Sequence, residues 1–456
     1  MRNKIINKTV LLLLAAVLTS CLTVKDYKSP EIKNSDIFRT EVTAADIKPE
    51  KQLQWRKFFS DPILINYIDS ALVNNFDNKI AFENIKKAEA YLEQGKLNVL
   101  PSLALNANVQ RTETKKSDSE QYKLSGDFDW EIDLWGKLTS QKNASEASFL
   151  KSVVTQKYMQ TNIISGVAKT YYQLLVADEE LRIMEETLLI KEKNLYYLHQ
   201  LKEAGMIDQI QINRITAQVD ETKTRLNQTK KRVLALENAL VLLLGKPYKN
   251  LERGRIADQN MTELNTKNIT AKYLSNRPDL KEAELDLRYF FEQNNVAYAS
   301  LYPSIRLSAS LGFSSLDISD WFDSESSFLT LIGGITQPIF ARGELEARLK
   351  ASESDLHQSI FRFRKKMLEA GMEVSNTIKD YETNSENLIL SESQEKQFEE
   401  ALSNTEELFR AGNLNYIEVL AAQETLLNVK LARISTQSAR LQSAATLYRA
   451  LGGGVE

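Results

Sequence analysis

Residues 122–137 read YKLSGDFDWEIDLWGK, and this stretch decides the fold. Apolar and aromatic side chains alternate in it with polar ones, which is the two-residue period of a β-strand. One set of alternate positions contains Tyr122, Leu124, Gly126, Phe128, Trp130, Ile132 and Leu134. The other set carries Asp127, Asp129, Glu131 and Asp133. The strand is therefore expected to have one face for an apolar environment and one for water.

A second, earlier strand completes a hairpin. Similar alternation begins at Leu103, after Pro101, and a polar loop over 112–121 joins it to the first stretch, which predicts a β-hairpin over 101–135. Such a hairpin could belong to a soluble sandwich. Strands of roughly 9 to 13 residues, however, have the length that a tilted strand needs to cross lipid.

In a membrane the four acids have one suitable environment. They would line a water-filled lumen, because an unpaired carboxylate in a packed core costs several kcal/mol. The apolar face would meet lipid, with Trp130 and Trp135 at one membrane interface.

The whole pattern occurs twice along the chain. Asp77 and Asp279 lie 202 residues apart, as do Pro101 and Pro303, and Gly245 and Gly452 lie 207 apart. A repeat of this length predicts a duplicated architectural unit and not a solenoid. We expect a first repeat over 77–250, a linker or equatorial segment over 251–278, and a second repeat over 279–456 with its hairpin at 303–341.

The duplication gives four strands per chain, which are too few to close a membrane barrel. Small membrane barrels need about eight strands, and an open sheet edge is not tolerated in lipid. Several chains must therefore share one barrel.

Each hairpin is followed by a very long helical stretch. Residues 138–202 contain no proline and a single glycine, and at 1.5 Å per residue they would extend about 95 Å. Leucines at 174, 181, 188 and 195 keep a seven-residue spacing that predicts a coiled-coil seam. Gly205 and Gly412 supply turns to return helices. The predicted fold class is thus mostly α, with long coiled-coil helices and a transmembrane β-barrel portion.

The N-terminus carries an export signal. Arg2, Lys4 and Lys8 precede an apolar run over 10–18 that is too short to span a bilayer, so residues 1–20 are expected to be a signal peptide. The run ends in LTSC at 18–21, which resembles a bacterial lipobox, and Cys21 is the one cysteine of the chain. We expect Cys21 to be acylated, although an ordinary signal with an incidental cysteine is the alternative. Residues 21–76 would then form a lipid-anchored N-terminal segment.

Composition excludes several functional classes. The 456 residues are 26% charged with a net charge of −3, and the mean hydropathy is −0.35. These values do not fit a nucleic-acid binder or a bundle of transmembrane helices. We find no nucleophile with a base, no metal-ligand cluster and no phosphate loop, so no enzyme activity, cofactor or metal is predicted.

Five motifs together resemble those of the TolC-like outer-membrane efflux proteins of the lipoprotein type. They are WEIDLWGK at 130–137, RPDL at 277–280, LYPSI at 301–305, AG at 411–412 with YIEVL at 416–420, and LYRALGGG at 447–454. The resemblance implies a homotrimer whose twelve strands form one outer-membrane barrel, continued by a periplasmic helical tunnel. It also implies a passive exit duct for small molecules such as drugs, toxic compounds or metal ions. Leu22, which follows the acylated cysteine, agrees with the outer membrane, because lipoproteins retained at the inner membrane tend to have an aspartate there.

The resemblance further assigns partners and sites. A periplasmic adaptor would contact the turns at Gly205, Met206, Gly412, Asn413 and Leu414, and the adaptor would join the duct to an inner-membrane pump of the resistance-nodulation-division type. Glu418 would line the periplasmic aperture, although Ala421 replaces the second acid of the family's pattern. Gln211 and Leu414 stand where the founding member has an Asp and an Arg, so a salt-linked closed gate is not expected. The alternatives are an outlet for type I protein secretion and a non-conducting, lipid-anchored coiled-coil scaffold.

Overall fold

The computed structural model describes residues 24–29, 54–113, 118–247, 250–259, 274 and 276–454. The predicted signal peptide and Cys21 lie outside these residues. The chain divides into two compact units. One unit contains Glu83–Val153 and Glu282–Lys365, and the other contains Val154–Lys281 and Lys366–Glu456, each with part of the N-terminal region.

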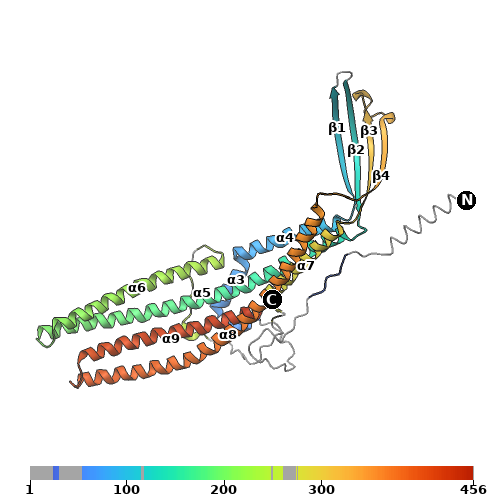
Figure 1. The fold of residues 1–456 in the computed structure, drawn as a ribbon. Coiled ribbons are helices and arrows are strands. Elements are labelled where there is room, and N and C mark those ends of the chain that lie inside the picture. Colours follow the sequence, from blue (N-terminus) through green and yellow to red (C-terminus); the bar gives the residue numbers. More distant parts are fainter. Residues whose placement is uncertain are drawn as a thin grey trace. The chain divides into compact units, whose positions relative to one another are not determined.

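The first unit contains a four-stranded antiparallel sheet in the order β1-β2-β3-β4 (Figure 1). Strands β1 (Ser102–Glu113) and β2 (Asp118–Ile132) form the first hairpin. Strands β3 (Ser304–Ser315) and β4 (Ser327–Thr336) form the second. Pairing of β2 with β3 joins the two hairpins. The two predicted hairpins are confirmed, and β4 ends just before Pro338, which has no N–H to donate to a sheet.

The register sorts the side chains of the sheet by polarity. Asp127 lies opposite Ser310, and Asp129 lies opposite Ser308. Leu124 lies opposite Ala107 on one side and Phe313 on the other. Directly opposite residues point to the same face of a sheet, so polar residues of neighbouring strands share one face and apolar residues share the other.

Two helices of 67 residues each, α5 (Lys137–Glu203) and α8 (Glu344–Arg410), follow the hairpins and confirm the predicted long helices. In the second unit the return helix α6 (Gln209–Leu244) runs beside α5, and α9 (Tyr416–Ala450) runs beside α8 (Figure 1). Helices α4 (Phe76–Leu97) and α7 (Pro278–Ala299) precede the hairpins. Across the described ranges, none of the helices combines the length and the apolar composition that crossing a membrane requires.

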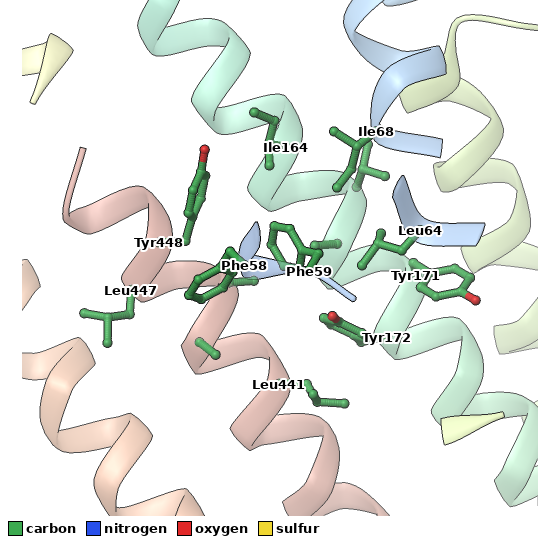
Figure 2. Packing of buried hydrophobic residues seen from close by; sticks show 14 of the residues in the cluster. Phe58, Phe59, Leu64, Ile68, Ile164, Tyr171, Tyr172, Leu441, Leu447 and Tyr448 are labelled. Carbon is green, nitrogen blue, oxygen red and sulfur yellow. The ribbon is translucent and has the colours of Figure 1, made fainter. Parts of the chain in front are cut away.

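The main core of the second unit is rich in aromatic side chains. Phe58, at the end of the short helix α2 (Trp55–Phe58), and Phe59 lie between α5 and α9, whereas Leu64 and Ile68 of α3 (Pro62–Asn74) pack against α5 on the side of α6 (Figure 2). The Phe58 ring lies 5.3 Å from the Tyr448 ring, centroid to centroid. Fully burying one such side chain contributes about 1.5 to 3 kcal/mol. Residues 55–72 of the predicted N-terminal segment thus contribute to the core of the second unit.

The coiled-coil seam changes its residues along α5. Leu174 of the predicted heptad is fully buried, but Leu181, Leu188 and Leu195 are half-exposed. The buried positions there are Met184, Lys191 and Leu198, again seven residues apart and three residues later in each heptad. The buried seam therefore shifts from the first to the second core position of each heptad, and Lys191 occupies one of these second positions.

In each repeat, the glycine after the return helix packs against the residues just before the repeat's first long helix. Gly245 ends α6 in the left-handed conformation (φ 61°) beside the Asn74 carbonyl, and Gly452 follows α9 (φ 71°) beside the Asn276 carbonyl. In both repeats the residue that follows this asparagine donates a hydrogen bond to a carbonyl near the end of the return helix. Asn75 Nδ2 reaches Leu243 O at 2.9 Å, and Arg277 NH1 reaches Ala450 O at 2.9 Å.

Candidate functional sites

Three of the four predicted lumen acids lie together on the polar face of the sheet. Asp127 accepts hydrogen bonds from Asn106 Nδ2 at 2.5 Å and from Ser310 Oγ at 2.5 Å. Asp129 accepts from Ser308 Oγ at 2.6 Å. Hydroxyl donors of β3 thus hold both carboxylates in place while leaving them partly open to solvent.

Glu131 sits among cations at one end of this face. Its carboxylate accepts from Lys137 Nζ at 2.9 Å, and Arg306 NH2 lies 3.6 Å from it. The charge of this acid is therefore partly balanced within the chain, whereas Asp127 and Asp129 accept hydrogen bonds from neutral hydroxyl and amide groups.

Asp133 has a different place from its three neighbours. It follows the end of β2, and its carboxylate accepts from the backbone N–H groups of Leu138 at 2.9 Å and Thr139 at 2.8 Å. These groups belong to the first turn of α5, which has no helical acceptor for them. Asp133 therefore caps the helix, and its assignment to the lumen stays a prediction. The alternating pattern of the strand did not indicate this capping role, although the helix that starts soon after Gly136 could have indicated it.

The two predicted interface tryptophans anchor the same end of the sheet. Trp130 Nε1 donates to Val99 O at 3.0 Å, just before β1, and Trp135 Nε1 donates to Pro303 O at 2.7 Å, just before β3. Trp135 also stacks on Tyr302, with centroids 5.1 Å apart. Each indole thus donates a hydrogen bond through Nε1, and the rest of its ring is apolar, which is the usual combination at membrane interfaces. Their position in a membrane stays a prediction.

The N-terminal segment 24–29 packs beside this end of the sheet. A Cβ added at Gly136 would lie 2.7 Å from Val24 Cγ2, so the Val24 side chain packs directly against the Gly136 backbone. Lys25 O accepts from Asn295 Nδ2 at 2.9 Å. The Tyr27 ring packs edge-on against Phe291, and burial, followed by the nearby Glu284 carboxylate, raises the pKa of its hydroxyl to about 12.

The turns at 204–208 and 411–415, which we call the helix tips, have the same construction. Gly205 (φ 74°) and Gly412 (φ 77°) adopt the left-handed conformation. The residue after each glycine donates back into the helix, Met206 N to Leu201 O at 2.9 Å and Asn413 N to Leu408 O at 2.9 Å. Met206 and Asn413 are exposed and Leu414 is half-buried. The tips thus place exposed side chains on hydrogen-bonded turns.

Near the second tip, Glu418 lies in the first turn of α9 and is exposed. Its side chain has no hydrogen-bond or ion-pair partner within the residues that the structure describes. The helix N-terminus beside it favours a negative charge. Gln211, at the other tip, accepts from Asp208 N at 3.0 Å and so caps α6.

A buried polar layer that the sequence did not reveal connects three helices above the tips. Lys191 of α5 donates to Glu424 Oε2 of α9 at 2.6 Å and to Thr222 Oγ1 of α6 at 3.2 Å. Asn194 adds a bond to Gln423 at 3.1 Å. The layer lines a groove of about 650 Å³ between α5, α8 and α9. A lysine in charged helical sequence looks like a surface residue, and only the return helix shows it to be buried.

Comparisons with known proteins agree with this arrangement. The family model described as "Outer membrane efflux protein" matches residues 67–246 and 270–453. The probable outer membrane lipoprotein SilC of Salmonella typhimurium is 28% identical over 411 residues, covering 88% of this chain and 88% of that protein. The cation efflux system protein CusC of Escherichia coli O6:H1 is 25% identical over 448 residues, covering 96% and 97%. The solved structure of the Campylobacter jejuni CmeC outer membrane channel superposes with a TM-score of 0.87 at 22% identity, covering 96% of each chain.

Proposed function

The chain belongs to the outer membrane efflux protein family, and from this premise we propose that three copies of it form one passive exit duct. The family consists of outer-membrane channels for efflux and not of enzymes. We propose that the duct receives small molecules, among them drugs, toxic compounds or metal ions, from an inner-membrane pump of the resistance-nodulation-division type. A periplasmic adaptor protein would connect the two.

The main support for this proposal is the strand order of the four-stranded sheet. Strands β1 and β4 each have one edge without a partner strand in the described part of the chain. Unpaired backbone groups are too costly in lipid, so these edges require strands from other copies. Three copies with four strands each would close a twelve-stranded barrel.

The two faces of the sheet support the same assembly. On the apolar face, Leu105 is 78% exposed and Leu331 is 73% exposed in the single chain. Such a surface needs an apolar environment, which lipid supplies. Asp127, Asp129 and Glu131 on the other face would then line the lumen.

The N-terminal segment supports a lipid anchor on Cys21. Val24, three residues further on, packs at the end of the sheet that carries Trp130 and Trp135. Acyl chains attached to Cys21 would therefore enter the membrane close to the proposed interface.

Subunit number in detergent is the direct test of the shared barrel. We expect the membrane-extracted protein, corrected for bound detergent, to have the mass of three mature chains, each below the 51.9 kDa of the full sequence because residues 1–20 would be removed. Planar-bilayer conductance of the same material would separate a duct from a coiled-coil scaffold. A monomer, or a protein released from membranes without detergent, would contradict the proposal and favour the scaffold. Export of a polypeptide instead of small molecules by the intact system would favour the protein-secretion alternative.

At the tips, we propose that Gly205, Met206, Gly412, Asn413 and Leu414 contact the adaptor and that three copies of Glu418 ring the aperture. Like charges held close together in a pore favour cations. We therefore expect Glu418→Gln to lower the cation-to-anion permeability ratio toward unity, as measured from reversal potentials in a salt gradient. Glu407→Gln, which changes an exposed acid of α8 near the same tip, is the matched control. Equal selectivity in both variants would show that Glu418 does not face the ion path.

A further inference from the structure

The loop between β3 and β4 exposes an unusual amount of apolar surface. It spans 316–326 and contains two single-turn helices, η5 (Ile318–Asp320) and η6 (Ser324–Ser326). Leu316 is 73% exposed, and Ile318 and Phe322 are each 63% exposed. Neighbouring exposed apolar side chains of this size indicate an interaction surface.

The loop packs toward the apolar face of the sheet. The Trp321 ring lies 5.6 Å from the Tyr122 ring, and the Phe322 ring lies 6.0 Å from the Phe313 ring, centroid to centroid. Trp321 and Phe322 stack on each other at 5.0 Å. Phe313 lies directly opposite Leu124, and Tyr122 is two residues from Leu124 on the same strand. Tyr122 and Phe313 therefore share the apolar face.

The polar face at the same level has other partners. Ser314 accepts from Gln121 Nε2 at 3.2 Å. Lys123 Nζ lies over the Phe328 ring, 5.1 Å from its centroid. Within the described residues, the ring contacts that Trp321 and Phe322 make with the strands are to residues of the apolar face. A loop that folded over the lumen would instead contact polar residues such as Lys123 and Ser314.

We propose that residues 316–322 form a lipid anchor in the outer leaflet, with Leu316, Ile318, Trp321 and Phe322 packed among acyl chains. Lipid is the partner of this loop in our proposal because these side chains extend the apolar face that lipid covers in the proposed duct. The inference rests on that part of the proposed function. It assigns this loop to the outside of the barrel, so the loop does not obstruct the mouth of the channel.

The acids of the loop fit this position. Asp317 accepts from Ser319 N at 2.9 Å and so caps η5, while Asp323 and Glu325 are exposed. Aromatic rings with neighbouring polar groups are typical of the boundary between acyl chains and water. The loop would thus lie at that boundary and not deep in the bilayer.

Nitroxide accessibility tests the proposal in the full-length protein reconstituted in phospholipid vesicles. Spin labels would be attached to Ile318→Cys and Phe322→Cys, to Leu331→Cys as a strand control, and to Glu325→Cys as a water-facing loop control. The unsubstituted chain gives the background from Cys21. We expect labels at 318 and 322 to collide with oxygen more than with a water-soluble nickel chelate, as at 331, with the opposite preference at 325.

The controls distinguish the two ways of failing. Labels at 318 and 322 that prefer the nickel chelate, while 331 prefers oxygen, would overturn the lipid anchor and leave the membrane sheet intact. Preference for the nickel chelate at 331 as well would overturn both the anchor and the proposed barrel. As an independent readout, Phe322→Ser should leave single-channel conductance unchanged, whereas a rise would identify the loop as a lid.

Discussion

Gly245→Ala is expected to destabilise the helical unit by about 3 kcal/mol or more, whereas Gly205→Ala should cost only about 1 kcal/mol. Both glycines have a positive φ, 61° and 74°, so the backbone strain of adding a side chain is similar. The surroundings differ. A Cβ at Gly245 would lie 2.3 Å from Asn74 O, whereas at Gly205 it would meet no atom of the described chain within 4 Å.

The clash at Gly245 cannot be relieved by rotating a side chain. Its nearest neighbours are the backbone atoms of Asn74 and Asn75, so α3 or the end of α6 would have to move. Urea unfolding of the detergent-solubilised protein, followed by helical circular dichroism, would measure both costs. Equal costs for the two variants would show that only the backbone strain matters and that the packing of Gly245 against Asn74 adjusts to a side chain.

Gly452 provides a graded test of the same idea. Its φ is 71°, and a Cβ there would lie 3.0 Å from Asn276 O, a milder contact than at Gly245. Gly452→Ala should therefore fall between the other two variants. This order would follow from duplication, because each repeat ends on a glycine that packs against the residues just before its own first long helix.

Sequence reasoning predicted the features that recur at fixed spacing. The alternation in 122–134 gave β2, and the glycines at 205 and 412 gave the tips, because a strand period and a left-handed turn are local properties of the chain. The duplication supplied the second hairpin and the second long helix. These predictions depend on neighbours in sequence and not on tertiary contacts.

The features that sequence reasoning missed depend on contacts between distant segments. Asp133 continues the alternation of the strand, but the N–H groups of α5 decide its role. Lys191 is buried only because Glu424 and Thr222 approach from two other helices. The loop at 316–326 mixes apolar and acidic residues in sequence, and only its packing on Tyr122 and Phe313 shows where its apolar residues point.

Arg277→Met should cost about 3 to 5 kcal/mol, because it leaves a buried carboxylate without its main partner. Arg277 is 4% exposed, and its guanidinium donates to Asp279 at 3.0 and 2.8 Å and to Glu373 at 2.6 Å. Asp279 is 3% exposed, and without Arg277 the cation that remains beside it in the described part of the chain would be Lys366, 3.4 Å away. Asn75→Ala, at the equivalent position of the first repeat, should cost only about 1 to 2 kcal/mol, because neutral bonds are lost there.

The pH dependence of the Arg277→Met deficit separates lost charge pairing from lost packing. Burial tends to raise the pKa of Asp279, but the hydrogen bonds and charge of Arg277, with Lys366, bring it below its ordinary value. In the wild type this carboxylate therefore stabilises the fold above its unfolded pKa of about 3.9, and that contribution is lost as the pH falls through the lower folded pKa. Without Arg277, burial should raise the folded pKa above the unfolded one, so the variant should lose stability as the pH rises. The unfolding deficit should thus be larger at pH 8 than at pH 5, whereas an equal deficit at both would mean that Arg277 acts through packing alone.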